Sequence, residues 1–324
     1  MLAALTAASP SALVAEVRDL EIRFGGGVQA LAGVTLQIPA QTTIGIVGES
    51  GSGKTTLAKA LVGLRRPTGG LVRLAGRDVY ALAGGERTWL SRQVQMIFQD
   101  PVSSLSPRFT IRELLAEPLR IHRLPLAEHW PRISDMLEVL GIRKSLLDRY
   151  PHQISGGQAR RVSIARALVL EPRLIVADEP TAGLDVSIQG ELLNLLQRVR
   201  QLYGPSLLVV SHNLSVIRRI TDEVGVMYLG KMVEYGATER LFRTPRHPYT
   251  EALISANPVI DPNKRRAKIV LAGEIPSPRN PPSGCRFHTR CPRARERCRA
   301  EEPSLGELAP GQLGACFYPV PYIH

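Results

Sequence analysis

The amino-acid sequence predicts an α/β protein large enough to bury a full hydrophobic core. Between residue 13 and about residue 234, apolar strand-like runs alternate with helical patterns, which is typical of the α/β class. A glycine-rich turn joins one such strand directly to a helix. Two further buried strands, at 174–177 and 207–210, flank a helical pattern with one apolar face.

The predicted elements follow one another in a regular order. Residues 43–47 form a short apolar strand, and residues 54–62 form a helix that Gly63 and the turn at 67–70 end. Apolar residues at 71–74 and 94–98 indicate further strands. From about 101 to 150, apolar residues recur at helical spacing between prolines, so we expect an inserted helical subdomain.

Composition and spacing divide the chain into three parts. Residues 1–12 are expected to be a flexible leader, because they are apolar but lack the basic start of a signal peptide. Residues 13–245 form the α/β domain. Residues 246–324 are rich in proline and arginine with little periodicity, and they are expected to be a separate, loop-rich module. No run of 18 apolar residues occurs, so we expect a cytoplasmic location.

The turn after the first apolar strand matches the phosphate-loop pattern G-x4-G-K-[ST]. Its glycines let backbone N–H groups point at phosphate oxygens, and the start of the following helix favours negative charge. Lys54 brings a positive charge to the phosphates, and the Thr55 hydroxyl is suited to Mg²⁺. The residues predicted to bind the nucleotide here are Gly48, Glu49, Ser50, Gly51, Ser52, Gly53, Lys54, Thr55 and Thr56.

Two adjacent carboxylates follow the buried strand at 174–177. Asp178 is placed to hold Mg²⁺, and Glu179 is placed to orient or deprotonate an attacking water. Carboxyl ends of strands are where open α/β sheets bind ligands. The alternative is a strand that ends in two solvated acids, and the phosphate loop argues against it.

A second glycine-rich helix start lies at Ser155, where Ser155 is a natural N-cap. A Ser-Gly-Gly-Gln helix start shortly before a strand that ends in Asp-Glu-Pro resembles the ABC ATPase family. This family has a RecA-like sheet with an antiparallel β subdomain and an inserted helical subdomain. Two of its subunits meet head to tail, so the resemblance implies that this segment contacts a partner's ATP. The segment consists of Ser155, Gly156, Gly157 and Gln158.

Further motifs of the same family can be found in order. Gln99 is similar to its Mg²⁺-sensing glutamine, and Asp185 to the aspartate at the dimer seam. His212 is similar to the switch histidine, and Phe24 to the aromatic residue that stacks on adenine. Asn213 departs from the usual aspartate. The resemblance implies ATP as substrate, with Mg²⁺ held by Thr55, Gln99 and Asp178, and with Glu179 and His212 as catalytic residues.

Three features of the C-terminal part resemble the C-terminal extension of ATPases from dipeptide and oligopeptide importers: residues 245–250, residues 273–278 and the four cysteines. That resemblance implies a heterodimer with a second, related ATPase, two membrane permeases and an external solute-binding protein. Such a subunit is peripheral, on the cytoplasmic face of the plasma membrane. Relatives that move nickel complexes or glutathione remain alternatives.

A non-transport ABC ATPase acting on nucleic acid would use the net charge of +12. It would usually show a long coiled-coil insertion or two cassettes, and this sequence has neither, so we expect no nucleic-acid partner.

Four cysteines fall in the last 40 residues, spaced C-x5-C-x6-C-x17-C. In a reducing cytosol such a cluster indicates a metal site rather than two disulfides. Zinc sites more often contain a close C-x2–4-C pair, so the wide spacing favours a [4Fe–4S] cluster, with zinc as the alternative. The resemblance implies the same cluster. The expected ligands are Cys285, Cys291, Cys298 and Cys316.

Overall fold

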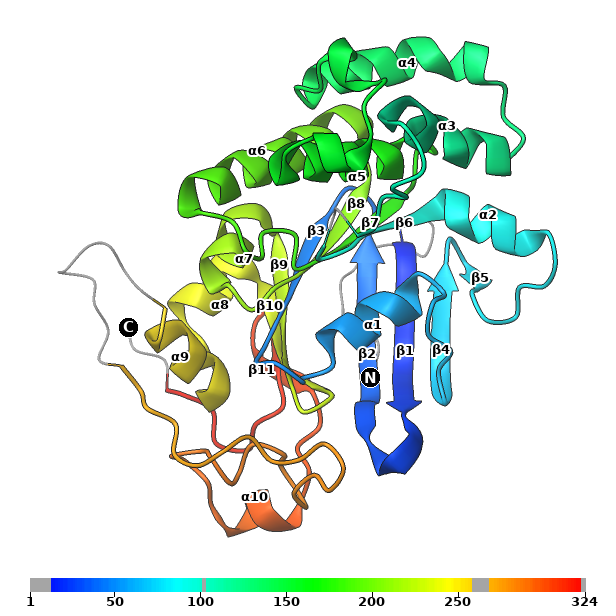
Figure 1. The fold of residues 1–324 in the computed structure, drawn as a ribbon. Coiled ribbons are helices and arrows are strands. Elements are labelled where there is room, and N and C mark those ends of the chain that lie inside the picture. Colours follow the sequence, from blue (N-terminus) through cyan, green and yellow to red (C-terminus); the bar gives the residue numbers. More distant parts are fainter. Residues whose placement is uncertain (1–12, 101–102, 258–267, 322–324) are drawn as a thin grey trace.

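The described residues form two β-sheets with helices between and around them (Figure 1). The computed structural model describes residues 13–100, 103–257 and 268–321. The predicted leader at 1–12 lies outside these ranges. Within them, no helix is long and apolar enough to cross a membrane.

The larger sheet has eight strands in the order β11-β12-β10-β9-β3-β8-β7-β6. The neighbours from β9 to β6 are parallel, and every residue of β3, β7 and β8 is buried. A parallel strand covered on both faces is apolar throughout, which is why these runs were visible in the sequence. The strands are β3 (Thr43–Val47), β6 (Val94–Ile97), β7 (Leu174–Asp178), β8 (Ser206–Val210), β9 (Glu223–Tyr228), β10 (Lys231–Ala237), β11 (Gly306–Ala309) and β12 (Gln312–Gly314).

The smaller sheet is antiparallel, with the order β2-β1-β4-β5. Helix α1 contacts strands of both sheets, and one buried cluster contains side chains from α1 and from each sheet. Helix α1 therefore holds the phosphate loop against both layers. The elements are β1 (Leu13–Arg23), η3 (Gly25–Gly27), β2 (Gln29–Pro39), α1 (Lys54–Leu61), β4 (Gly69–Leu74), β5 (Arg77–Asp78) and α2 (Glu86–Gln93).

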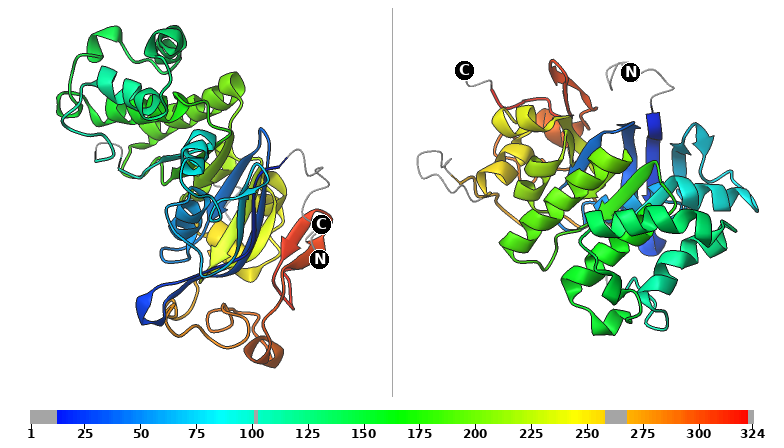
Figure 2. Two further views of the ribbon diagram at one scale, coloured as in Figure 1. Left: turned by 90° about the vertical axis from the view of Figure 1, so that its right-hand side faces the viewer. Right: turned by 90° about the horizontal axis from the view of Figure 1, so that it is seen from above.

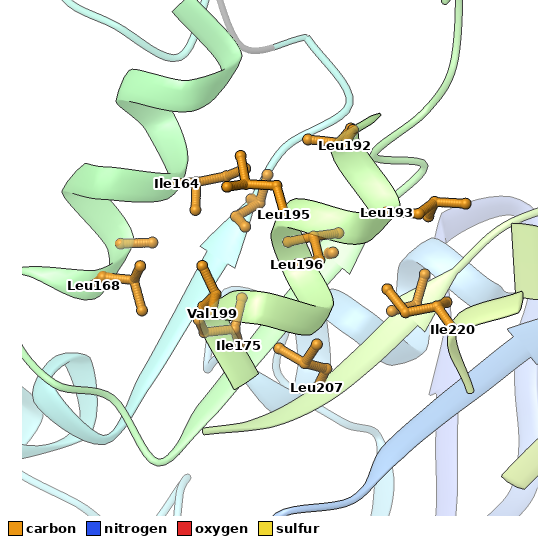
Figure 3. Close-up of a cluster of buried hydrophobic side chains, with 14 of the residues drawn as sticks. Ile164, Leu168, Ile175, Leu192, Leu193, Leu195, Leu196, Val199, Leu207 and Ile220 are labelled. Carbon is orange, nitrogen blue, oxygen red and sulfur yellow. The ribbon is translucent and has the colours of Figure 1, made fainter. Parts of the chain in front are cut away.

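The second buried cluster lies on the other face of the large sheet, under α6 (Val186–Tyr203). Figure 3 shows Leu196 and Val199 of α6 beside Ile175 of β7 and Leu207 of β8. The buried apolar residues of α6 lie three and four positions apart, which puts their side chains on one face of the helix. The same cluster includes residues of α5 (Gly156–Leu168) and α7 (Leu214–Ile220).

Helices α3 (Ile111–Ile121) and α4 (Leu126–Val139) pack on α5 and lie at the end of the molecule opposite to α10 (Glu296–Ala300) (Figures 1 and 2). A capping box starts α3, because Thr110 and Glu113 each bond the other's backbone. The short helices η4 (Lys144–Leu146) and η5 (Pro151–Gln153) lead into α5. Helices α3 and α4, which lie in the stretch where the helical subdomain was predicted (101–150), therefore pack on α5.

The C-terminal extension is joined to the large sheet rather than standing apart from it. Strand β12 pairs with β10, and β11 pairs with β12. Glu234 of β10, fully buried, accepts hydrogen bonds from the backbone of Arg246 and His247 and from the Gln312 side chain. The expectation of a separate module did not include these long-range contacts. Helix α8 (Thr238–Arg243) precedes the extension, and α9 (Pro248–Ser255) is its first helix.

The packing of α6 predicts a stability difference between two of its leucines. Leu196 is 1% exposed and Leu202 is 56% exposed. Leu196→Ala leaves a cavity in the core, so we expect it to lower the free energy of unfolding by about 2–5 kcal/mol. The control Leu202→Ala should change it by less than about 0.5 kcal/mol. Urea denaturation measures both, and equal losses would contradict the packing described here.

Candidate functional site

The phosphate loop follows β3 and leads into α1, and two of its glycines have no room for a side chain. Gly48 has φ 153° and Gly53 has φ 101°. A Cβ atom would lie 2.2 Å from the Met227 carbonyl oxygen at Gly48, and 2.4 Å from the Ala30 carbonyl oxygen at Gly53. Both glycines are therefore required for the loop to curl tightly at the start of α1.

The Lys54 side chain lies under this loop. Its Nζ atom donates hydrogen bonds to the carbonyl oxygens of Gly48 at 2.8 Å and Glu49 at 2.9 Å. Burial lowers the pKa of Lys54 from its usual value, while the carboxylates of Glu179, Asp178 and Glu49 oppose that shift. These hydrogen bonds hold the Lys54 ammonium group against the backbone of the phosphate loop.

A pocket of about 670 Å³ opens beside the loop, and we call it the phosphate-loop pocket. Its wall contains residues predicted from five separate motifs: the phosphate loop, the acid pair, and those of Gln99, His212 and Phe24. Four residues of the predicted nucleotide-binding set do not line the pocket: Gly48, Glu49, Ser52 and Asp178. Of these, Ser52 and Asp178 are buried. The wall consists of Phe24, Val28, Ala30, Ser50, Gly51, Gly53, Lys54, Thr55, Thr56, Gln99, Glu179, His212 and Pro278.

Asp178 at the end of β7 is 6% exposed and contacts the start of α1. The Thr55 hydroxyl donates a hydrogen bond of 3.0 Å to the Asp178 carboxylate. Burial raises the pKa of Asp178, and this hydrogen bond opposes the rise. A hydroxyl and a carboxylate in contact at this position are oxygen ligands of the kind that Mg²⁺ prefers.

Glu179 lies between β7 and the end of β8. Its carboxylate accepts hydrogen bonds from the His212 backbone N–H at 3.0 Å and from the Ser211 hydroxyl at 3.2 Å. The His212 Nδ1 atom lies 2.8 Å from the same carboxylate. The backbone of Glu179 has φ 48°, a strained conformation for a residue other than glycine. Side-chain contacts with Ser211 and His212 hold that carboxylate at the pocket wall.

Gln99 and Phe24 reach the phosphate-loop pocket from different elements. Gln99 is exposed, two residues after the end of β6. Phe24 follows β1, and the Arg65 guanidinium lies 4.0 Å from the centre of its ring. The prediction of Phe24 is consistent with its place in the wall, although the ring already stacks with a cation.

Ser155 caps α5 as its residue type predicts. The Ser155 hydroxyl accepts from the Gln158 N–H at 3.2 Å, and the Gln158 side chain accepts from the Ser155 N–H at 3.0 Å. Ser155, Gly156 and Gly157 are exposed, as is Asp185 before α6. In the described ranges, none of these residues lines the phosphate-loop pocket of the same chain.

Asn213 caps helix α7. Its side-chain oxygen accepts from the backbone N–H groups of Ser215 at 3.0 Å and Val216 at 3.4 Å. An aspartate would accept the same bonds, so the departure from the resembled pattern keeps the local structure after His212.

The four cysteines come together at one small pocket, and none forms a disulfide. Its free volume is about 10 Å³, and its wall also contains His247, Phe287 and His288. Burial raises the pKa of Cys285 to about 11 and that of Cys316 to about 12, and neighbouring thiols add to the rise. Among the described residues, no group of three or more His, Cys, Asp or Glu side chains is arranged to hold a metal ion.

Several contacts at the site were missed from the sequence. Pro278 of the extension lines the phosphate-loop pocket, and Arg290 pairs with Glu49 in the loop itself. Tyr249 accepts a hydrogen bond from the Glu49 backbone at 2.9 Å. The only signal available was the acid at the second position of the loop, which needs a cationic partner when it is partly buried.

Comparison with known proteins adds two family matches. A model described as "ABC transporter" matches residues 31–182. A model described as "Oligopeptide/dipeptide transporter, C-terminal region" matches residues 233–298. The second match includes three of the four cysteines.

Relatives with similar names cover nearly the whole chain. A putative oligopeptide transport ATP-binding protein, YkfD, of Bacillus subtilis is 47% identical over 93% of this chain and 94% of its own length. The di/tripeptide transport ATP-binding protein DppF of Pseudomonas aeruginosa is 46% identical over 90% of each chain. The oligopeptide transport ATP-binding protein OppF of Salmonella typhimurium is 47% identical over 90% of this chain and 92% of its own.

Solved structures show the same fold. CbiO1 of Clostridium perfringens, part of an ABC transporter complex, has a TM-score of 0.66 and 28% identity over 72% of this chain and 91% of its own. The ATP-binding cassette MJ0796 was solved as a dimer bound to ADP and phosphate after hydrolysis. It has a TM-score of 0.61 and 27% identity, and the match covers 69% of this chain and 98% of MJ0796. The chain belongs to the ABC ATPase family, within the group of oligopeptide and dipeptide transport ATP-binding proteins.

Proposed function

We propose that this chain binds and hydrolyses ATP to power the import of dipeptides or oligopeptides through an ABC transporter. The observation that carries the proposal is a pocket of about 670 Å³ whose wall contains Lys54, Thr55 and Glu179, with buried Asp178 hydrogen-bonded to the Thr55 hydroxyl. The peptide-transport names of relatives at 46–47% identity support the substrate class.

Each group in the site has a chemical task in this proposal. The phosphate loop and Lys54 hold the β- and γ-phosphates, and Phe24 contacts the adenine. Thr55, Asp178 and Gln99 hold Mg²⁺, which supplies charge neutralisation on the phosphate oxygens when bound. Glu179 accepts the proton of the attacking water, and His212, with 68% of its side chain exposed, reaches the γ-phosphate.

The second half of the ATP site is supplied by a partner subunit. Ser155, Gly156 and Gly157 are exposed, and the segment 155–158 does not line its own chain's pocket, so its capped helix start is available to a partner's nucleotide. A dimeric solved relative containing ADP and phosphate supports this arrangement. We assign the partner to a second, related ATPase, with Asp185 at the dimer seam.

The complete transporter then contains two membrane permeases and an external solute-binding protein. The ATPase subunits act as peripheral proteins on the cytoplasmic face of the membrane. The names of the relatives as ATP-binding proteins of transport systems support these assignments. Import of a nickel complex or glutathione is the alternative for the solute.

The four cysteines are assigned to a [4Fe–4S] cluster with a structural role. Four cysteines, one buried and three partly buried, line one pocket and form a donor set for thiophilic metals, and bound cations would stabilise the thiolates. The free volume of about 10 Å³ is that of about one water molecule, so the side chains have to move apart around a cluster. Zinc requires less movement and is the alternative.

Glu179→Gln tests the chemistry. The amide keeps the shape of the side chain but accepts protons poorly, so hydrolysis in the assembled transporter should fall by about 10²-fold or more while ATP binding is retained. The comparison variant Lys54→Ala should weaken nucleotide binding itself. Phosphate release and a binding titration measure the two effects, and wild-type hydrolysis by Glu179→Gln would show that its role is different.

Ser155→Arg tests the composite site. A bulky cation at the start of α5 blocks the partner's γ-phosphate position, so peptide transport should fall while the isolated subunit still binds nucleotide. Uptake into proteoliposomes and nucleotide binding by the isolated subunit give the two readouts. Loss of binding in the isolated subunit would mean that residues 155–158 serve their own chain's nucleotide.

Metal analysis of anaerobically purified protein tests the assignment of the cysteines. The expected result is about four iron atoms per chain and a broad absorption band near 400 nm, where thiolate-ligated clusters absorb. Cys298→Ser should remove the band, because Cys298 is the most buried of the four thiols. Stoichiometric zinc without iron would replace the cluster assignment with a zinc site.

A further inference from the structure

The loop between Cys285 and Cys291 reaches across to the phosphate loop. Arg290, one residue before the second cysteine, makes two hydrogen bonds to the Glu49 carboxylate, at 2.7 and 3.1 Å. The Arg290 side chain is 8% exposed and that of Glu49 is 25% exposed. Such a two-pronged, largely buried ion pair fixes the relative position of both partners.

Glu49 also contacts the nucleotide site through its backbone. Its N–H group donates to the Tyr249 hydroxyl at 2.9 Å, and its carbonyl oxygen accepts from Lys54 at 2.9 Å. The Tyr249 ring packs against Phe287 with the ring centres 5.3 Å apart. Phe287 belongs to the same cysteine loop and lines the cysteine pocket. Glu49 is therefore in contact with the cysteine loop on one side and with Lys54 on the other.

The cysteine loop is also linked to the wall of the phosphate-loop pocket through Gln29. Arg286 donates hydrogen bonds to the Leu229 carbonyl oxygen and, at 2.7 Å, to the Gln29 side chain. The Gln29 N–H group donates to the carbonyl oxygen of Pro278, which lines the pocket. Figures 1 and 2 show this part of the extension beside the turn between β1 and β2.

The negative charge of Glu49 lies in the loop that would hold the phosphates, so its pairing with Arg290 bears on nucleotide binding. A carboxylate in the phosphate loop repels the phosphates and competes with them for Lys54, whose charged form it favours. The Arg290 guanidinium pairs with that carboxylate, and Glu49 is not among the residues of the pocket wall. Without Arg290, the loop would present an unpaired negative charge close to the bound anion.

We propose that Arg290 is a positioning residue for the phosphate loop, and that it couples the state of the cysteine loop to nucleotide affinity. The part that concerns Arg290 and Glu49 depends only on contacts between described residues. The coupling to the cysteines rests on the proposed metal centre, because ligands at residues 285 and 291 would fix both ends of the loop. By linkage, nucleotide binding then also favours the ligated form of the loop.

The first test compares Arg290→Ala with Arg297→Ala in the isolated full-length subunit. Arg297 is an arginine of the same extension whose ion pair is with exposed Glu301. Isothermal titration with the non-hydrolysable analogue AMP-PNP and Mg²⁺ should show affinity weakened about tenfold or more by Arg290→Ala, from loss of a partly buried pair. Arg297→Ala should stay within about twofold of wild type.

A double-mutant cycle distinguishes positioning through Glu49 from a general structural effect. In a Glu49→Gln background, Arg290 has no carboxylate to hold, so Arg290→Ala should change the affinity by less than about twofold. Arg290→Lys keeps the positive charge but loses the two-point contact of the guanidinium, so its AMP-PNP affinity should lie between those of wild type and Arg290→Ala. An affinity for Arg290→Ala within twofold of wild type, or an equal loss in both backgrounds, would overturn the proposal.

A second pair of variants tests the coupling to the cysteines. Cys291→Ser should weaken AMP-PNP binding in the otherwise wild-type chain. In the Arg290→Ala background, the same substitution should weaken AMP-PNP binding further by less than about twofold. Unchanged affinity for Cys291→Ser with loss of metal would overturn the coupling. Purified wild-type protein without any metal would instead contradict the proposed metal centre and leave the Arg290–Glu49 result standing.

Discussion

The burial of three parallel strands is the constraint on which the rest of this structure depends. Strands β3, β7 and β8 are covered on both faces, so their backbone groups are satisfied only by pairing in register. That register brings the three carboxyl ends to one edge of the sheet. The phosphate loop, the Asp178–Glu179 pair and His212 each follow one of these strands, and therefore meet although they are far apart in sequence.

Much of the fold was predictable because its signals are local. The apolar run at 43–47 coincides with β3, and the helix expected at 54–62 is α1 (Lys54–Leu61). The helical pattern expected between the strands at 174–177 and 207–210 is α6 (Val186–Tyr203). The hydrogen bonds that cap α5 follow from Ser155 and Gln158 three residues apart. In each case the residues that decide the structure are neighbours in the chain.

The extension was less predictable because its contacts are long-range. Neither the pairing of β12 with β10 nor the three hydrogen bonds to buried Glu234 has a local sequence signature. Arg290 and Glu49 are 241 residues apart, and an arginine among many others gives no indication of its partner. The spacing of the cysteines did indicate that four thiols would gather, and they do line one pocket, but spacing does not identify the metal.

Coupling between ATP hydrolysis by this chain and peptide import can be measured directly. The chain would be reconstituted in proteoliposomes with the proposed second ATPase, the two proposed permeases and the proposed solute-binding protein. We expect solute-binding protein loaded with peptide to raise ATP hydrolysis, and labelled peptide to accumulate in proportion to the ATP consumed. Hydrolysis that does not respond to loaded solute-binding protein, without peptide uptake, would contradict this coupling.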